Sequence, residues 1–298
     1  MSAPSSTLFT APPEWHWLII FYFFLGGIAG GAYFLGALMD LFGGPLQRPL
    51  ARLAYLVAFP LTVVCGLLLI ADLRRPLRFW HMMLQSETLR PMLKVWSPMS
   101  LGSWALLLFG FFAFLAFLGA LAEDERWRWR GLARLRPPGL LGLVVAVLGG
   151  VLGFFVAGYT GVLLTVTNRP IWGDTTLLGL VFLISGASTA AALLALLGQR
   201  RAASSVHALE RFDSIMLVLE LVALIALVVS LGGVARLWLS VWGALLVLGV
   251  VVLGILIPLG LYRRSLRFGD ASGVAAAALV LAGGFLLRVV IILSSEGA

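Results

Sequence analysis

Four side chains able to exchange protons or donate hydrogen bonds lie in or beside long apolar stretches of the sequence. They are Tyr22, Asp72, His81 and Tyr159. Counted as membrane helices, which rise 1.5 Å per residue, their segments place all four in the same half of the bilayer. Polar residues inside a membrane are costly and usually functional. Two phenols, a carboxylate and an imidazole at one depth suit a lipid-soluble carbonyl compound that takes up or releases protons, and a quinone is the obvious candidate.

Each of these residues also has a structural interpretation. Tyr22 and Tyr159 could be buried tyrosines that donate to backbone carbonyls. Asp72 could form an interfacial ion pair with the arginines that follow it, and His81 could be a solvated loop histidine. Their shared depth favours a common site over four separate structural roles. His16 lies at the mouth of the same side.

A second group of charged residues lies in the C-terminal half. It consists of Arg211, Asp213, Glu220 and Arg288. Because an isolated charge inside a membrane is expensive, we expect pairing, for instance of Glu220 with Arg288. The group could form a proton relay from the cytoplasm toward the outer site, or a structural ion pair that locks two helices together.

The elements that position these residues are predicted to be membrane helices. The chain is 61% hydrophobic and 11% charged, whereas a soluble domain carries about 25% charged residues. Eight apolar runs are each long enough to cross about 30 Å of hydrocarbon, which predicts an all-α, polytopic membrane protein. The runs lie at about 16–42, 51–73, 98–122, 139–167, 172–198, 206–232, 236–262 and 272–294.

Composition also limits the cofactors and partners of the protein. Iron–sulfur clusters need several thiolates, and Cys65 is the single cysteine. The histidines His16, His81 and His207 lie at membrane edges, so a haem held by two histidines is not expected. No metal or nucleotide motif is present, so no metal site is predicted. The net charge of +8 is interpreted as a sign of membrane topology rather than of nucleic-acid binding.

The distribution of basic residues predicts the orientation. The loops on the side of the two termini carry seven Lys and Arg residues, and those on the other side carry thirteen. The positive-inside rule therefore places the richer side in the cytoplasm and both termini outside. Small residues indicate close helix packing, notably Gly26-Gly27 and Gly30-Gly31. We expect two four-helix bundles, over 1–170 with the proton-exchanging site and over 171–298 with the charged group.

Several motifs resemble the polysulfide-reductase membrane-subunit family (NrfD/PsrC-like). The likeness follows the eight predicted helices in order and ends at Arg288. The motifs are Trp15-His16-Trp17, Gly26 to Tyr33, Asp72 to His81, Ser97 to Trp104, Tyr159 to Leu164 and Asn168 to Trp172.

The resemblance implies a haem-free, quinone-binding anchor of a respiratory complex in a bacterial or archaeal cell membrane. The quinone, menaquinone or ubiquinone, would bind in the N-terminal bundle near the outer face. The family's anchors sit beneath a ferredoxin-like subunit with four iron–sulfur clusters, which connects to a molybdopterin catalytic subunit. The chemistry on the second substrate would then belong to a partner.

The resemblance also assigns roles to single residues. Tyr159 matches the family's quinone-site tyrosine. Ile19 and Tyr22 stand where the family has an Asn and a His about one turn apart, so Asp72 and His81 would supply the missing polar groups.

His16, placed by its depth at the mouth of the same side, completes the predicted quinone-binding set. By the same resemblance, Arg288 and Glu220 match the family's proposed proton-path residues.

Two functions follow from these observations. The first is a membrane subunit that exchanges electrons and protons between a quinone or quinol and an iron–sulfur partner. The alternative is a secondary transporter or channel, which would also explain charged residues within the membrane. That alternative predicts discontinuous helices, for example around Gly158–Gly161.

Overall fold

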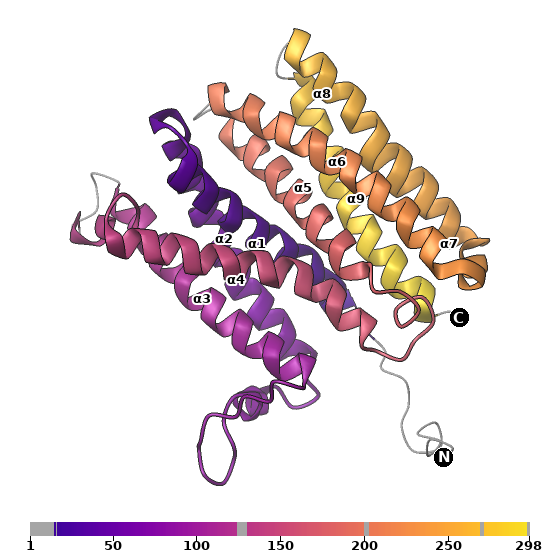
Figure 1. Cartoon of the computed structure of the whole chain (residues 1–298), viewed down its shortest axis with the longest axis horizontal. Coiled ribbons are helices and arrows are strands. Elements are labelled where there is room, and N and C mark those ends of the chain that lie inside the picture. The colour runs from indigo at the N-terminus through magenta and orange to yellow at the C-terminus, as the bar shows by residue number, and fades with distance from the viewer. Residues whose placement is uncertain (1–14, 16, 124–129, 200–202, 269–270, 297–298) are drawn as a thin grey trace.

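The protein folds into helices joined by short connections, as the computed structural model shows for residues 15, 17–123, 130–199, 203–268 and 271–296 (Figure 1). Eight stretches are long and apolar enough to cross a membrane, the seventh being made of α7, the π-helix and α8. The prediction of an all-α protein with eight membrane helices is therefore confirmed. The helices that build these spans are α1 Trp17–Phe42, α2 Arg48–Asp72, α3 Pro98–Ala122, α4 Leu140–Thr165, α5 Leu178–Gly198, α6 Ala203–Leu231, α7 Val241–Ala244, a π-helix Leu245–Leu256, α8 Ile257–Phe268 and α9 Ala271–Glu296.

Two predicted helix starts were wrong. The fifth helix begins at Leu178, so residues 172–177 form a loop in which the amide of Ile171 donates to Asp174 at 2.9 Å. The seventh span begins at Val241, because the segment before it forms the 3₁₀ turn Gly232–Trp238. Both misassigned segments contain apolar residues that pack back onto the bundle from a loop. Hydropathy alone does not separate such residues from the helix that follows.

Helix α4 continues without a break through Gly158 and Gly161. The discontinuity that the transporter alternative placed there is therefore not found. Gly161 serves packing, since a side chain there would collide with the backbone of Leu178 and Gly179 in α5.

The helices alternate in direction, so that α1 begins and α9 ends at the same end of the molecule, called the terminal end below (Figure 1). Side chains tie these segments together there. The indole of Trp172 donates to the carbonyl of Ile291 at 2.8 Å, and its ring lies 5.2 Å from that of Trp15. The hydroxyl of Ser295 donates to Pro170 at 2.8 Å. The loop between α4 and α5 therefore fixes the start of α1 to the end of α9.

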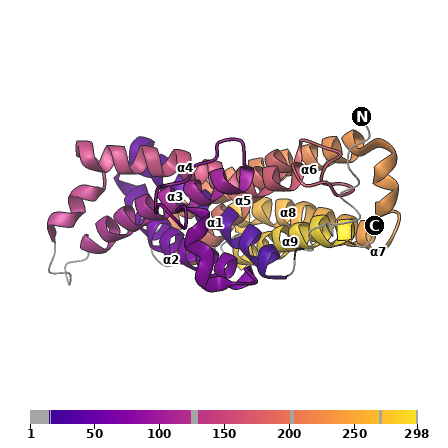
Figure 2. The ribbon, with the colours of Figure 1, turned by 90° about the horizontal axis from the view of Figure 1, so that it is seen from below.

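Helix α1 lies in the middle of the molecule and packs against α2, α4 and α5 (Figure 2). Glycines allow this close approach. A side chain at Gly30 would overlap the backbone of Gly153 in α4, and one at Gly31 would come within 2.7 Å of the Gly186 carbonyl oxygen in α5. The small-residue motifs of the sequence are thus the contact surfaces of the central helix.

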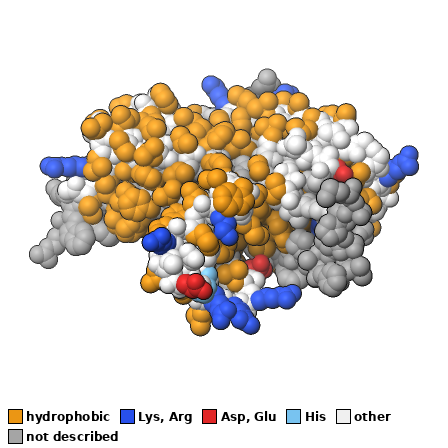
Figure 3. Space-filling model, turned by 60° about the horizontal axis from the view of Figure 1, so that its bottom comes forward, with side chains coloured by type: hydrophobic (Ala, Val, Ile, Leu, Met, Phe, Trp, Pro, Cys, Tyr) orange, Lys and Arg blue, Asp and Glu red, His pale blue; other side chains and the backbone are white. Residues whose placement is uncertain are grey.

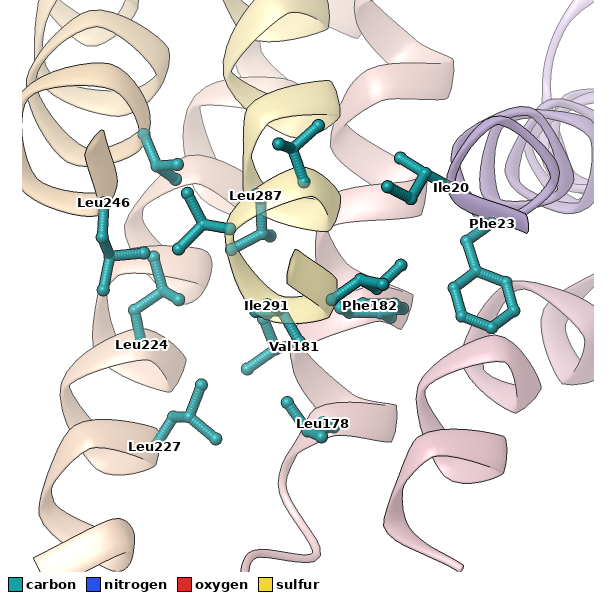
Figure 4. Close-up of a cluster of buried hydrophobic side chains, with 14 of the residues drawn as sticks. Ile20, Phe23, Leu178, Val181, Phe182, Leu224, Leu227, Leu246, Leu287 and Ile291 are labelled. Atoms are coloured by element: carbon teal, nitrogen blue, oxygen red, sulfur yellow. The ribbon is translucent and has the colours of Figure 1, made fainter. Parts of the chain in front are cut away.

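A large apolar core joins the C-terminal helices to α1. Leu224 and Leu227 of α6, Leu246 of the π-helix, and Leu287 and Ile291 of α9 point toward one another (Figure 4). The same cluster continues through α5 to Ile20 and Phe23 of α1. This packing holds the polar residues of α5, α6 and α9 in fixed positions.

An ion-pair network closes the end opposite to the terminal end. Arg136, which follows the 3₁₀ turn Arg130–Leu135, is fully buried and binds Asp40 of α1 with two bonds of 2.6 and 3.0 Å. Arg136 also pairs with Glu123, which in turn binds Arg48 at 2.6 Å. Two cations and two carboxylates thus compensate each other and join α1, α2 and the end of α3.

Candidate functional site

Tyr159 lies where α4 meets the start of α3, at the terminal end. Its ring occupies the space of the missing side chain of Gly102, because a Cβ atom there would overlap the phenol. Its hydroxyl donates to the carbonyl oxygen of Pro98 in the first turn of α3. Ser97 caps this helix by accepting from the Ser100 amide at 3.4 Å. The tyrosine is therefore held in place by the helix start that it faces.

Tyr22 brings a second phenol to the same region from α1. The residue is buried, six residues into α1, and its ring packs against that of Phe23. Cys65 of α2 lies beside it, with its thiol 3.9 Å from the Tyr22 carbonyl oxygen. Gly26 faces the Tyr22 ring, since a Cβ atom at Gly26 would be in van der Waals contact with it at 3.7 Å. The structure therefore brings residues of α1, α2, α3 and α4 together around two phenols, which we call the tyrosine cluster.

Asp72 and His81 lie further toward the surface. Asp72 is the last residue of α2, seven residues beyond Cys65, and is half-buried. His81 lies in the 3₁₀ turn Pro76–Met82, with Nδ1 at 3.0 Å from the Ser86 hydroxyl. Among the described residues, no hydrogen bond links Asp72 or His81 to either tyrosine. The structure therefore places them beside the cluster at its terminal end, and not in contact with it.

The two other residues assigned to this region have different outcomes. Ile19 is buried one turn before Tyr22, in the same apolar core as Trp15. His16 lies outside the described residues.

Arg288 is the centre of a second polar cluster, and its side chain is fully buried. Its guanidinium donates to the Ser185 hydroxyl of α5 at 2.5 Å and to the Gly284 carbonyl at 2.8 Å. Glu220 of α6 lies buried near the same Ser185 hydroxyl and interacts electrostatically with Arg288. The expected pair is thus linked through a hydroxyl group. No direct Glu220–Arg288 ion pair within 4.0 Å occurs among the described ion pairs.

Asp213 lies two turns before Glu220 on α6 and is also fully buried. Its carboxylate accepts from the Ser188 hydroxyl of α5 at 2.5 Å and from the Tyr262 hydroxyl of α8 at 2.7 Å. Neutral donors from two other helices therefore satisfy this carboxylate.

The buried polar face of α6 continues to Glu210, whose carboxylate lies 3.9 Å from Nδ1 of His207. Glu210 and Glu220 are ten residues apart, so the carboxylates span about 15 Å of helix. Sequence reasoning did not assign a role to Glu210, although it shares a helix face with Asp213.

Arg211 does not join this group. It is exposed on α6, whereas its neighbours Glu210 and Asp213 are buried. A helix turns about 100° per residue, which places Arg211 on nearly the opposite face from Asp213 and Glu220. The structure therefore brings three of the four predicted charged residues together and leaves the fourth outside.

The two clusters meet at α1. Gly26 faces the Tyr22 ring, whereas a side chain at the next residue, Gly27, would come within 3.3 Å of Nη2 of Arg288. Consecutive glycines of one helix thus border the tyrosine cluster on one side and the Arg288 cluster on the other.

The tyrosine cluster offers the donors that a quinone needs. Two phenols can donate to carbonyl oxygens, and a phenol hydrogen rotates to suit its acceptor. No group of three or more His, Cys, Asp or Glu residues that could hold a metal ion occurs in the part of the protein that the structure describes.

Comparisons with known proteins agree over almost the whole length of the protein. Residues 8–296 match the family model described as "Polysulphide reductase, NrfD". The C subunit of polysulfide reductase from Wolinella succinogenes is 30% identical over 308 residues, which cover 95% of the present sequence and 94% of the relative. Protein NrfD of Escherichia coli is 28% identical over 314 residues, which cover 95% of each sequence.

Proposed function

Because the protein belongs to the polysulphide reductase NrfD family, as its motifs predicted, we propose that it is the quinone-reactive membrane subunit of a respiratory oxidoreductase complex. One observation carries this proposal. Two phenols from different helices, Tyr22 of α1 and Tyr159 of α4, are both buried near the terminal end in a member of a family of redox-complex subunits.

The tyrosine cluster is the proposed quinone site, between α1, α2 and α4. A bound quinone accepts two electrons and two protons to become a quinol. Tyr159 would hydrogen-bond one carbonyl oxygen after its hydroxyl turns away from Pro98. Tyr22 would hold the ring from α1, beside the buried side chain of Ile19, and His16 would lie at the mouth.

Asp72 and His81 are the proposed proton-exchanging groups. Both are partly exposed, Asp72 at the last residue of α2 and His81 in the turn that follows it, so water can reach them. A carboxylate and an imidazole are the side chains that most often act as general bases and acids in proton transfer. Proton exchange therefore falls to the groups at the edge, and hydrogen bonding to the buried ones.

The Arg288 cluster is the proposed proton path. The carboxylates of Glu210, Asp213 and Glu220 follow one buried face of α6, and Ser185 joins Glu220 to Arg288. Arg288 reaches α1 at Gly27, next to the residue that borders Tyr22. This arrangement supports a route from the opposite end to the quinone site.

Electrons would be exchanged with an iron–sulfur partner at the terminal end. The connection between α2 and α3 carries the exposed basic residues Arg74, Arg75, Arg78, Arg90 and Lys94. Figure 3 shows charged side chains gathered at the bottom of the molecule, while apolar side chains cover much of the rest of this face. A basic patch favours an acidic partner surface. We propose a ferredoxin-like four-cluster subunit there, which would connect to a molybdopterin catalytic subunit.

The proposed location rests on the charge bias of the loops and on the family. We propose a bacterial or archaeal cell membrane, with both termini and the basic α2–α3 connection on the outer side. The proposed partner would then lie outside the membrane as well.

The test removes single hydroxyl groups from the complex. Tyr159→Phe should lower the rate of turnover with a quinol such as menadiol by about ten- to a hundredfold, the effect of losing one hydrogen bond in the reacting state. Tyr33→Phe is the matched control. Tyr33 lies on α1, as Tyr22 does, and its hydroxyl also donates to a backbone carbonyl, that of Val145 at 2.8 Å.

Assembly and bound quinone are measured on the same preparations. Mass spectrometry of the purified complex should identify a cysteine-rich partner, and solvent extraction should recover quinone. Equal turnover in Tyr159→Phe and Tyr33→Phe would remove Tyr159 from the site. A stable preparation with neither partner nor quinone would favour the transporter.

A further inference from the structure

A groove lies between α1 and α6 at the end opposite to the terminal end, far from the tyrosine cluster. Its volume is about 220 Å³. Its walls are mostly apolar and include Leu35, Phe42, Leu209 and Phe212, and Gln47 adds one polar side chain. Both α1 and α6 are candidate membrane spans, and the groove lies where α1 ends and α6 begins.

The size and lining of the groove point to a hydrocarbon chain. Pockets that enclose whole drug-sized ligands measure about 300–1,000 Å³. A smaller groove that opens to the bilayer can take a segment of one acyl chain and leave the remainder outside. Phe42 is 82% exposed at its rim, which leaves a large apolar surface for such an acyl group to cover.

An exposed cation lies beside the groove. Arg211 is on α6, one turn after Ala208 and next to Phe212, both of which line the groove. A charge on the lipid-facing side of a membrane span is costly unless it reaches the interface. Helix side chains tilt toward the helix N-terminus, and α6 begins at this end of the molecule, so the Arg211 side chain leans toward the headgroups.

We propose that this groove binds one anionic phospholipid, with an acyl chain between α1 and α6 and the phosphate on Arg211. The chemistry is complementary at both ends, since the walls are apolar and the neighbouring charge is positive. The Gln47 amide lies at the loop end of the groove, with Gly43 and Ser205, and offers a further donor to the headgroup.

A bound lipid would strengthen the contact between α6 and the turn that follows α1. The Ser205 hydroxyl of α6 donates to the Leu46 carbonyl at 2.9 Å and ties α6 to the turn between α1 and α2. The groove lies directly beside this bond, because both Ser205 and Gln47 line it. The lipid would therefore bridge the N-terminal and C-terminal helices.

Native mass spectrometry of the complex with added dioleoylphosphatidylglycerol or dioleoylphosphatidylcholine tests the proposal. The wild-type protein should retain one phosphatidylglycerol about tenfold more tightly than phosphatidylcholine. Arg211→Gln should abolish this preference, and Ala208→Trp, which fills the groove, should lower retention of both lipids. Arg236→Gln is the matched control, since Arg236 is exposed at the terminal end.

The outcomes separate the lipid from other occupants. An unchanged preference in Arg211→Gln, or an equal loss in Arg236→Gln, would overturn the assignment to this arginine. Recovery of quinone instead of phospholipid from this groove, shown by displacement in Ala208→Trp, would overturn the proposed ligand. Because Arg211 is exposed, its variant tests the site even if Ala208→Trp does not fold.

Discussion

At the scale of single residues, hydroxyl groups carry much of the polar chemistry inside this membrane protein. Ser185 lies between Arg288 and Glu220, and Asp213 accepts from the hydroxyls of Ser188 and Tyr262. Neutral donors satisfy a buried carboxylate without a cation beside it. The carboxylate can then change its protonation state without breaking a tight ion pair, which suits a residue on a proton path.

Asp213→Asn should therefore slow proton transfer more than it disturbs folding. The amide keeps the shape of the side chain but cannot take up and release a proton. We expect proton uptake coupled to quinol turnover to fall by about a hundredfold, the usual size of a lost acid–base step. A pH-sensitive dye in proteoliposomes of the complex measures it.

Asp174→Asn is the control for this substitution. The same carboxylate-to-amide substitution is made in the loop before α5, where Asp174 accepts from the Ile171 amide. Normal proton uptake in Asp213→Asn would exclude Asp213 from the path.

Residue type and depth identified several polar residues that the structure buries within the spans. The buried positions of Tyr22, Tyr159 and Arg288 agree with their prediction as intramembrane polar residues. Cys65 and the serines of α5 were not assigned, because a thiol or a serine in an apolar helix is common for packing alone. Their role depends on which helix packs beside them, and the sequence does not state it.

Helical periodicity also carries information about the charged residues of α6. At about 100° per residue, Glu210, Asp213 and Glu220 share one side of α6, while Arg211 points away. Applied to the charged residues of α6, this angle would have included Glu210 in the predicted proton path and removed Arg211 from it.

At the scale of elements, α1 is the helix on which the others depend. Gly30 and Gly31 let it approach α4 and α5 closely, so a side chain at Gly30 would push α1 away from α4, and one at Gly31 would push it away from α5. The lengths of most of the eight spans could be predicted because each is a continuous apolar run. The segments 172–177 and 236–240 could not, because tryptophans in membrane-edge loops are as apolar as helix residues.

Gly30→Leu should destabilise the protein strongly. The new side chain would collide with the backbone of Gly153, which cannot move aside as a side chain can. We expect a loss of about 3 kcal/mol or more, at the upper end of the usual range for overpacking. The midpoint of thermal unfolding in detergent should fall by several degrees.

The comparison variant for this test is Gly66→Leu. Gly66 is also inside a membrane span, but a Cβ atom there meets nothing within 4 Å. Its midpoint should stay close to wild type. Equal stability of the two variants would contradict the close packing of α1 on α4.

At the scale of the whole molecule, the start of α1, the end of α9 and the basic α2–α3 connection share one end. The proposed partner, quinone site and proton path all require that this end lies on the outer face of the membrane. The charge bias among the loops supports an outer location.

Cysteine labelling in intact cells tests the orientation. Gly233→Cys at the terminal end should react with a membrane-impermeant maleimide, and Gly44→Cys at the opposite end should react only after permeabilisation. The two positions are matched, because a Cβ atom at either glycine meets nothing within 4 Å. Cys65 is fully buried and adds no background. The reverse pattern would invert the protein and remove the outer partner.

Gly26 and Gly27 show that the two polar clusters share a wall. One residue borders Tyr22 and the next borders Arg288, so a single turn of α1 belongs to both. A gene split in the loop between α4 and α5 would leave α1 with the first fragment and Arg288 with the second. The second fragment would carry the Arg288 cluster with one side uncovered, and two separately made halves would have to find each other before either cluster was complete.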